Sequence, residues 1–306
     1  MVDLSVTIGN VRFKNPIILA SGTCGFGREL EQYIDFCSVG ALSSKGLTLR
    51  PRQGNDGCRV AETPSGMLNS VGLQNPGVRY FVENDLQFMA SLPTGVIVNV
   101  AGHSTEDYVE AVRFLEPHRE FIDAIELNLS CPNVKEGCMV IGASPEALFQ
   151  LVSLVRKETT LPLWVKLTPN VTDISLTALA AQRAGADAVV AINTLLGMAI
   201  DVKTRRPILN NNTGGLSGPC IKPVALRMVE ACASVLDIPV IGCGGISTGE
   251  DVLAFMIAGA SAVQIGTSTL IHPSACETIT EEVVALAEDL NISSISEIVG
   301  TLNLWR

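Results

Sequence analysis

Eight short apolar runs of the sequence each end in a polar side chain or a glycine. In chain order, the residues at these ends are Ser21-Gly22, Lys45-Gly46, Asn99, Asn128, Lys166, Asn193-Thr194, Gly244-Gly245 and Gly266-Thr267. If the runs are parallel strands of one barrel, all of these residues lie at the same face. Chance would leave some apolar residues among them, so the pattern predicts one convergent site.

Two of these residues, Lys45 and Lys166, carry an ammonium group at the end of an apolar run. A buried ammonium is costly unless an anion accompanies it. Because acidic residues are scarce at the strand ends, we expect an anionic ligand, such as a phosphate, a carboxylate or an electron-rich ring, rather than a carboxylate of the protein. Glu126 alternates with Leu127 on the fourth run, and we interpret it as structural.

The uncharged groups at the other ends suit other parts of a ligand. The amides of Asn99, Asn128 and Asn193 supply donors and acceptors for a planar heterocycle with amide edges. Gly244-Gly245 and Gly266-Thr267 follow the last two runs, where barrels commonly hold a phosphate on exposed backbone N–H groups. The pattern therefore favours a ligand with a phosphate and a planar ring.

One cysteine of the nine, Cys131, lies just beyond the fourth run in the segment Asn128-Leu-Ser-Cys-Pro-Asn133. A thiol beside cationic groups is a candidate base or nucleophile, and the absence of a nearby histidine disfavours a Cys–His hydrolase. No two cysteines have C-x-x-C spacing, which disfavours a local zinc or iron–sulfur site. We expect the other eight to be small buried hydrophobes.

The apolar runs have the length and flanking residues of buried parallel strands. They are Ile17–Ala20, Ala41–Ser44, Val96–Val100, Ala124–Leu129, Leu163–Leu167, Ala188–Ile192, Val240–Cys243 and Ala262–Ile265. With helical patterns between most of them, they predict an α/β fold, a (β/α)8 TIM barrel formed by residues 1–306 as a single domain. A doubly wound open sheet is the alternative. The long connections Gly46–Pro93 and Leu195–Pro239 are expected to cover the C-terminal mouth of the barrel.

Several local signals mark where helices begin and end. Capping residues predict helix starts at Ser104, at Ser144 before Pro145, and at Ser247-x-x-Glu250. The similar segments Ala184–Val189 and Ala258–Val263 each place a glycine where a helix ends and a strand begins.

Composition excludes several classes of protein. The 306 residues are 47% hydrophobic and 17% charged, which excludes a disordered chain. The net charge of −10 argues against nucleic-acid binding. The longest nearly apolar stretch, Ala188–Ile200, is shorter than the roughly 20 residues that span a bilayer, and the N-terminus has no secretory pattern. We therefore expect a soluble, cytoplasmic protein with no membrane partner.

Ten motifs, taken together and in order, resemble the catalytic subunit of the class 1B dihydroorotate dehydrogenases, which are flavin enzymes of de novo pyrimidine (UMP) synthesis. They are ILASGT (18–23), SSKG (43–46), ETPSGMLNSVGLQNPG (62–77), NVAG (99–102), ELNLSCPNVK (126–135), VKLTPNV (165–171), INT (192–194), GGLSGP (214–219), GCGGI (242–246) and QIGTS (264–268).

The resemblance implies one FMN per chain across the barrel mouth and no metal. Its phosphate would bind at Gly218, Gly244, Gly245, Gly266 and Thr267. Its ribityl chain and ring would be lined by Ser21, Lys45, Gly46, Asn99, Asn128, Lys166 and Ile192. Dihydroorotate would stack on the ring, held by Lys45, Asn69, Ser70, Val71, Gly72, Leu73, Asn128, Asn193 and Thr194. Cys131 would remove the C5 proton while hydride passes from C6 to flavin N5.

The resemblance also implies a second subunit. Without iron–sulfur spacing or a second nucleotide domain, the chain would pass electrons to NAD+ through a partner that carries FAD and a 2Fe–2S cluster. A homodimer core within a heterotetramer is the implied assembly. The alternatives are a fumarate-using class 1A enzyme, another FMN barrel acting on a different pyrimidine or on dihydrouridine, and an aldolase-like barrel in which Lys166 forms a Schiff base.

Overall fold

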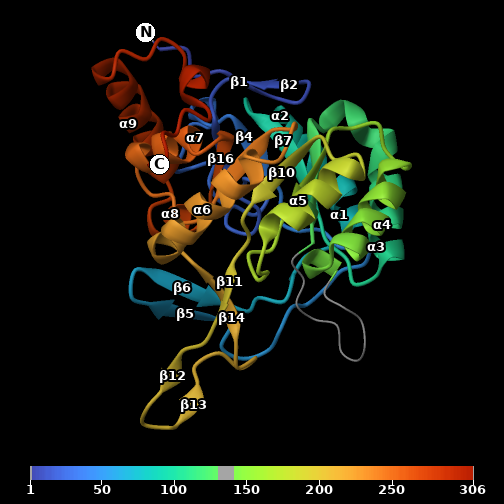
Figure 1. The fold of residues 1–306 in the computed structure, drawn as a ribbon. Helices are drawn as coiled ribbons and strands as arrows, with labels where there is room; N and C mark the ends of the chain where they lie inside the picture. Colours follow the sequence, from blue (N-terminus) through green and yellow to red (C-terminus); the bar gives the residue numbers. More distant parts are fainter. Residues whose placement is uncertain (1, 130–140, 306) are drawn as a thin grey trace.

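Eight parallel strands close into a barrel in the computed structural model, which describes residues 2–129 and 141–305 (Figure 1). Around the barrel they run in chain order: β3 (Ile17–Leu19), β4 (Ala41–Ser43), β7 (Gly95–Val100), β8 (Ala124–Asn128), β9 (Leu163–Lys166), β10 (Ala188–Ala191), β15 (Val240–Cys243) and β16 (Ala260–Ile265). Every predicted run is a barrel strand. The TIM barrel is confirmed, and the open doubly wound sheet is wrong because β16 pairs with β3.

Helices surround the barrel and connect most of its strands. They are α1 (Val78–Asn84), α2 (Leu86–Ser91), α3 (Thr105–Leu115), α4 (Pro145–Arg156), α5 (Ile174–Arg183), α6 (Lys222–Ala233), α7 (Gly249–Ile257), α8 (Thr267–Ile271) and α9 (Ala275–Asp289). Short 3-10 helices lie at Phe36–Ser38, Glu116–Phe121, Ile141–Ala143, Pro219–Ile221 and Ile295–Ile298. The link from β3 to β4 contains only the first of these.

The helix starts agree with the capping signals at two of three places. Ser104 and Ser144 are N-caps, and each hydroxyl accepts a hydrogen bond from the backbone N–H three residues later. The start predicted at Ser247 is wrong by one residue, because Thr248 is the N-cap and forms a capping box with Asp251. Asp251 also accepts from the backbone N–H of Ser247, which extends the cap outward.

Two glycines end helices in the left-handed conformation, as the repeated segments predict. Gly185 follows α5 with φ +97° and Gly259 follows α7 with φ +114°. A side chain at either position would be strained, so glycine lets the chain turn directly from helix into strand.

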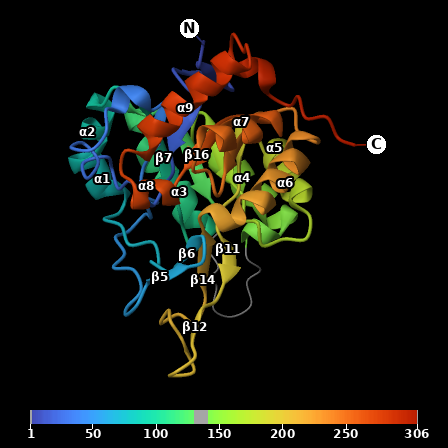
Figure 2. The same cartoon turned by 90° about the vertical axis from the view of Figure 1, so that its left-hand side faces the viewer.

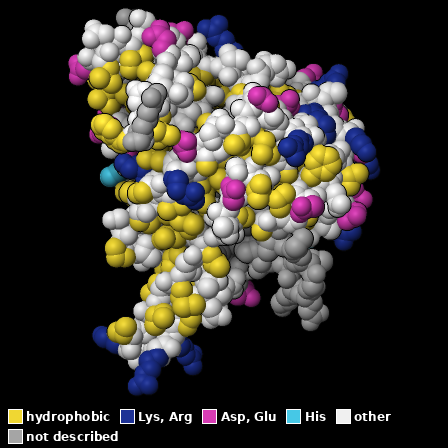
Figure 3. Space-filling model, in the orientation of Figure 1, with side chains coloured by type: hydrophobic (Ala, Val, Ile, Leu, Met, Phe, Trp, Pro, Cys, Tyr) yellow, Lys and Arg dark blue, Asp and Glu magenta, His cyan; other side chains and the backbone are white. Residues whose placement is uncertain are grey.

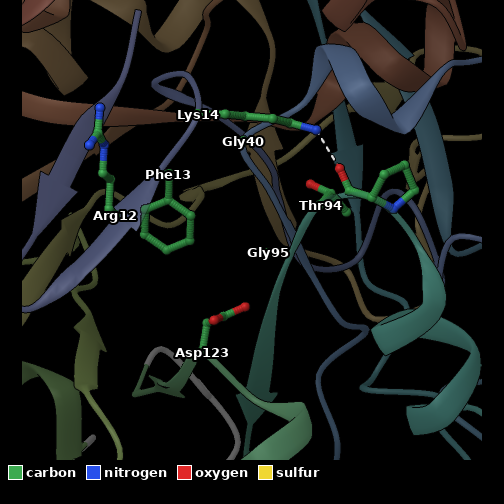
Figure 4. A pocket seen from close by; sticks show the side chains of 8 residues that line it. Arg12, Phe13, Lys14, Gly40, Thr94, Gly95 and Asp123 are labelled. Carbon is green, nitrogen blue, oxygen red and sulfur yellow. Dashed lines mark hydrogen bonds between the residues drawn. The ribbon is translucent and has the colours of Figure 1, made fainter.

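The N-terminal hairpin of β1 (Val6–Ile8) and β2 (Val11–Phe13) closes the end of the barrel opposite the mouth. Phe13 meets the buried Trp164 edge-on, with ring centroids 6.0 Å apart. A shallow cavity of about 230 Å³ lies here (Figure 4), and Arg12, Lys14 and Asp123 are among its lining residues. Lys14 donates to the carbonyls of Phe36 and Pro93, so its ammonium is already engaged.

The two long connections contribute strands rather than irregular loops. Strands β5 (Val60–Thr63) and β6 (Gly66–Asn69) from the first pair with β14 (Gly214–Ser217) and β11 (Leu195–Gly197) from the second, in the order β11-β14-β6-β5. All three pairings are antiparallel. A further hairpin, β12 (Ile200–Asp201) and β13 (Arg206–Pro207), extends beyond this sheet and projects from the body (Figures 1 and 2).

The cysteines are less uniformly buried than predicted. Cys24, Cys232 and Cys276 are buried, but Cys37, Cys58 and Cys220 are exposed and Cys243 is partly buried. The exposed three lie outside the barrel strands, in a short helical turn or a connection, so the prediction of eight buried hydrophobes is wrong for them. Within the described ranges, no helix combines the length and apolar character needed to cross a membrane.

Candidate active site

A buried polar network fills the barrel interior below the mouth. The carboxylate of Glu126, on β8 and 0% exposed, accepts hydrogen bonds from two amides, Asn99 Nδ2 at 2.5 Å and Gln264 Nε2. Gln264 Oε1 in turn accepts from Lys166 Nζ at 2.7 Å. Register explains the meeting, because Asn99 pairs with Glu126 across β7 and β8. Four strands of the closed barrel thus contribute one side chain each.

The expectation for Lys166 needs correction. Its ammonium lies 3.9 Å from Glu126 Oε1, so a carboxylate of the protein accompanies it. Burial opposes the charge, but the neighbouring Cys243 sulfur and Glu126 carboxylate outweigh it and raise the pKa of Lys166. The prediction considered only acidic residues at the strand ends, and Glu126 lies two residues before the end of β8. Lys45 differs, because none of the ion pairs formed by the described residues includes it.

At the mouth, three of the predicted residues lie around a fourth, Gly46. A Cβ at Gly46 would lie 2.9 Å from Asn99 Oδ1, 3.5 Å from Leu73 and 3.9 Å from Asn128 Nδ2. Only glycine therefore leaves room for both the backbone and the amides. Asn99 Oδ1 is buried and has no hydrogen-bond partner among the described residues. A buried acceptor without a partner costs free energy, which indicates that a ligand completes this site.

Asn128, which lies near Gly46, also joins a second amide, that of Asn193. Asn193 Nδ2 donates to Asn128 Oδ1 at 3.1 Å, and Tyr108 donates its hydroxyl to the Asn128 carbonyl at 2.6 Å. The phenol of Tyr108 thus anchors the end of β8. These contacts join β8 to the segment after β10 through uncharged groups.

The predicted substrate segment reaches the same mouth through β6 and β14. Asn69 Nδ2 donates to the carbonyl of Gly215, and a Cβ at Gly215 would lie 2.1 Å from Thr194 Oγ1. Asn69 and Thr194 therefore both lie against Gly215 of β14. Of the remaining predicted residues, Ser70 has a buried hydroxyl with no partner in the described part of the chain, and Val71 and Gly72 follow it toward Leu73.

The predicted phosphate residues form two groups of contacts. Thr267 Oγ1 donates to Ser217 Oγ at 2.8 Å, and a Cβ at Gly218 would lie 3.6 Å from the Thr267 methyl group. Gly244 and Gly245 have φ +130° and +79°, and a Cβ at Gly245 would lie 2.7 Å from the backbone N of Lys222. A Cβ at Gly244 would likewise lie 2.9 Å from Ala225, so the backbone at both glycines packs closely against the start of α6 and its neighbours.

Other predicted residues are less closely tied to these groups. Ser21 precedes Gly22, where a Cβ would meet nothing within 4 Å, and Gly266 packs near Ala20. The backbone N–H of Ile192 donates to the backbone carbonyl of Cys243. Cys131, the predicted base, lies outside the described residues.

Three residues of the site, Gln264, Cys243 and Ser217, are not among those predicted from the sequence. Gln264 and Cys243 line the interior network, and Ser217 holds Thr267. Gln264 had a signal, because a glutamine inside the apolar run Ala262–Ile265 requires a buried partner. Burial raises the pKa of the Cys243 thiol despite the opposing effect of Lys166.

Comparison with known proteins identifies the family of the chain. The family model described as dihydroorotate dehydrogenase matches residues 3–286. The dihydroorotate dehydrogenase B (NAD(+)) catalytic subunit of Geotalea uraniireducens is 50% identical over 98% of this chain and 98% of the relative. That of Caldicellulosiruptor saccharolyticus is 48% identical over 99% and 100%. The crystal structure of Eimeria tenella DHODH in complex with ferulenol has a TM-score of 0.80 and 23% identity, covering 98% of this chain and 88% of that one, which supports the fold. The chain therefore belongs to the dihydroorotate dehydrogenase family of oxidoreductases, as its motifs indicated.

Proposed function

We propose that this chain oxidises (S)-dihydroorotate to orotate in de novo pyrimidine synthesis, with FMN as its cofactor. The observation that carries the proposal is the group at the mouth around Gly46, where Asn99 Oδ1, which has no partner among the described residues, and Asn128 Nδ2 both lie close to Gly46. Lys45, without a carboxylate partner in the described ranges, adds a cation for a carboxylated substrate. The curated relatives carry the name of this enzyme.

The residues present fit FMN. Gly218, Gly244, Gly245, Gly266 and Thr267 would offer backbone N–H groups to its phosphate. Asn99 and Lys166 would supply an acceptor and a cation for the polar edge of its ring, and Ser21, Lys45, Gly46, Asn128 and Ile192 would line the remainder. When bound, the flavin supplies a two-electron acceptor for the hydride that leaves C6 of the substrate.

The protein residues bind and orient the substrate. Lys45 pairs with its carboxylate, while Asn128, Asn193, Thr194 and the 69–73 segment hold the amide edges of its ring through uncharged donors and acceptors. Cys131 is the base that takes the C5 proton, as the resemblance implies. The rate depends on keeping that proton within reach of the base.

The Schiff-base alternative is disfavoured by the surroundings of Lys166. An aldolase-like lysine needs a neutral amine, which requires a lowered pKa. The hydrogen bond to Gln264 and the nearby Glu126 carboxylate hold Lys166 in its charged form. A charged ammonium suits an anionic or electron-rich ligand instead.

Anaerobic mixing of the FMN-loaded chain with (S)-dihydroorotate tests the proposal. We expect rapid loss of the flavin absorption at about 450 nm. Dihydrouracil, which lacks the carboxylate, is the matched control and is expected to react far more slowly because Lys45 gains no partner. Equal reduction by both compounds would favour the other-pyrimidine alternative, and failure to bind flavin would exclude both.

We propose further that the electrons leave through a partner subunit with FAD and a 2Fe–2S cluster, around a homodimer core of this chain. Alternate residues from β11 to the turn after β12, namely Leu196, Met198, Ile200 and Val202, are exposed, the last at 83%. Lys203 and Arg205 lie in the turn between β12 and β13, and Arg206 begins β13. Figure 3 shows Lys and Arg side chains gathered at this projecting end. An apolar face of this kind is typical of a protein interaction surface.

The isolated, substrate-reduced chain is expected to reduce NAD+ at no more than a small fraction of the rate of flavin reduction. Adding the FAD/2Fe–2S partner should restore NAD+ reduction to a comparable rate. The measurement is NADH formation by stopped flow, with fumarate as a parallel acceptor. Fast oxidation by fumarate without the partner would support the class 1A alternative instead.

A further inference from the structure

Glu126 determines which way two neighbouring amides are turned. An ionised carboxylate accepts hydrogen bonds and cannot donate them. Asn99 and Gln264 must therefore both direct their NH2 groups at Glu126, as they do. Their carbonyl oxygens are thereby fixed on the opposite sides, with Gln264 Oε1 on Lys166 and Asn99 Oδ1 toward Gly46.

We infer that Glu126 is a positioning residue for the cofactor, acting through Asn99 and Lys166. It makes the site present an acceptor, Asn99 Oδ1, and a cation, Lys166 Nζ, to the ligand. An imide edge, in which an N–H group lies beside carbonyl oxygens, complements this pair. The inference rests on the proposed function, because that edge belongs to the flavin ring.

Burial makes this arrangement strict. Glu126 and Asn99 are 0% exposed and Gln264 is 1% exposed, so water cannot replace a misdirected amide. Gln264 cannot turn without directing its NH2 group at the Lys166 ammonium. Asn99 is the amide with freedom to turn, because its Oδ1 has no partner among the described residues. If the side chain at position 126 became able to donate, Asn99 would reverse and present NH2 to the ligand.

The test is Glu126→Gln in the otherwise intact full chain, with FMN affinity measured by fluorescence titration of the flavin-free protein. We expect FMN to bind about 10- to 100-fold more weakly, because a donor replaces an acceptor at the ring edge. The midpoint potential of bound FMN, a second readout, is expected to move as well. Glu116→Gln is the matched control, since Glu116 binds Thr159 and Thr160 away from the mouth and its loss should leave FMN affinity unchanged.

A second substitution separates positioning from a general structural defect. In Glu126→Gln/Asn99→Asp, the new carboxylate at position 99 accepts from the new amide at position 126 and still offers an acceptor to the ligand. We expect this double variant to recover about tenfold in affinity, whereas Asn99→Asp alone should bind FMN poorly because two carboxylates then face each other. If Glu126→Gln does not fold, the double variant compared with Asn99→Asp provides the same test.

Unchanged FMN affinity and potential in folded Glu126→Gln would overturn the inference, as would equal affinities of the double variant and Asn99→Asp. Failure of the wild-type chain to bind FMN would instead overturn the proposed function. The two failures are therefore distinguishable in one set of titrations.

Discussion

Cys131→Ser is expected to slow flavin reduction by dihydroorotate by about 10²- to 10⁴-fold at neutral pH, the range typical of losing a general base. A serine hydroxyl is far less acidic than a thiol, so almost none of it is ionised where a thiolate is available. The rate should therefore rise with pH in the variant beyond the point at which the wild-type rate levels off. Stopped-flow bleaching across a pH series measures both effects.

Cys138→Ser is the matched control for this change, because it makes the same substitution seven residues later at a cysteine with no proposed role. Both variants should bind FMN as tightly as the wild type, which separates loss of the base from loss of the cofactor. Undiminished bleaching in Cys131→Ser would show that the base lies elsewhere.

The barrel was predictable because its signal is local. Each buried strand is a short apolar run, and each run ends in a polar residue or glycine at the mouth, so both the strands and most of the site residues follow from the same pattern. The convergence of Gly46, Asn99 and Asn128 required only the rule that parallel strands end at one face.

The interior network was not predictable in the same way. Asn99, Glu126 and Lys166 lie on three consecutive, directly paired strands, but Gln264 lies on β16, which pairs with none of them. Its side chain reaches Glu126 and Lys166 only across the interior of the closed barrel. The order of the residues along the chain does not reveal that Glu126 lies beside Lys166. The sequence therefore predicted only a ligand as the anionic partner of Lys166. The cap at Thr248 has a different explanation, because two overlapping patterns, Ser247-x-x-Glu250 and Thr248-x-x-Asp251, fit a capping box and the structure uses the second.

Lys166→Met is expected to destabilise the flavin-free protein by about 3–5 kcal/mol, the usual cost of removing one partner of a buried ion pair. Methionine fills a similar volume, but it leaves the Glu126 carboxylate buried with two amides and no cation. Urea unfolding measures the loss, with an unchanged slope showing that the two-state transition is preserved. Lys157→Met is the control at an exposed lysine and should change stability by no more than about 0.5 kcal/mol.

The double variant Glu126→Gln/Lys166→Met shows whether the carboxylate is the cause. With both charges removed and Gln264 free to turn, we expect the cost to fall to about 2 kcal/mol or less. Equal losses in the single and double variants would mean that Lys166 contributes packing rather than charge compensation. If the cost does fall, the charge of Lys166 partly compensates the buried charge of Glu126. The role of the Glu126 carboxylate is then to orient the amides of Asn99 and Gln264. The unfolding measurements would then give the stability cost of burying the Glu126 carboxylate, and the FMN titrations would give its contribution to cofactor binding.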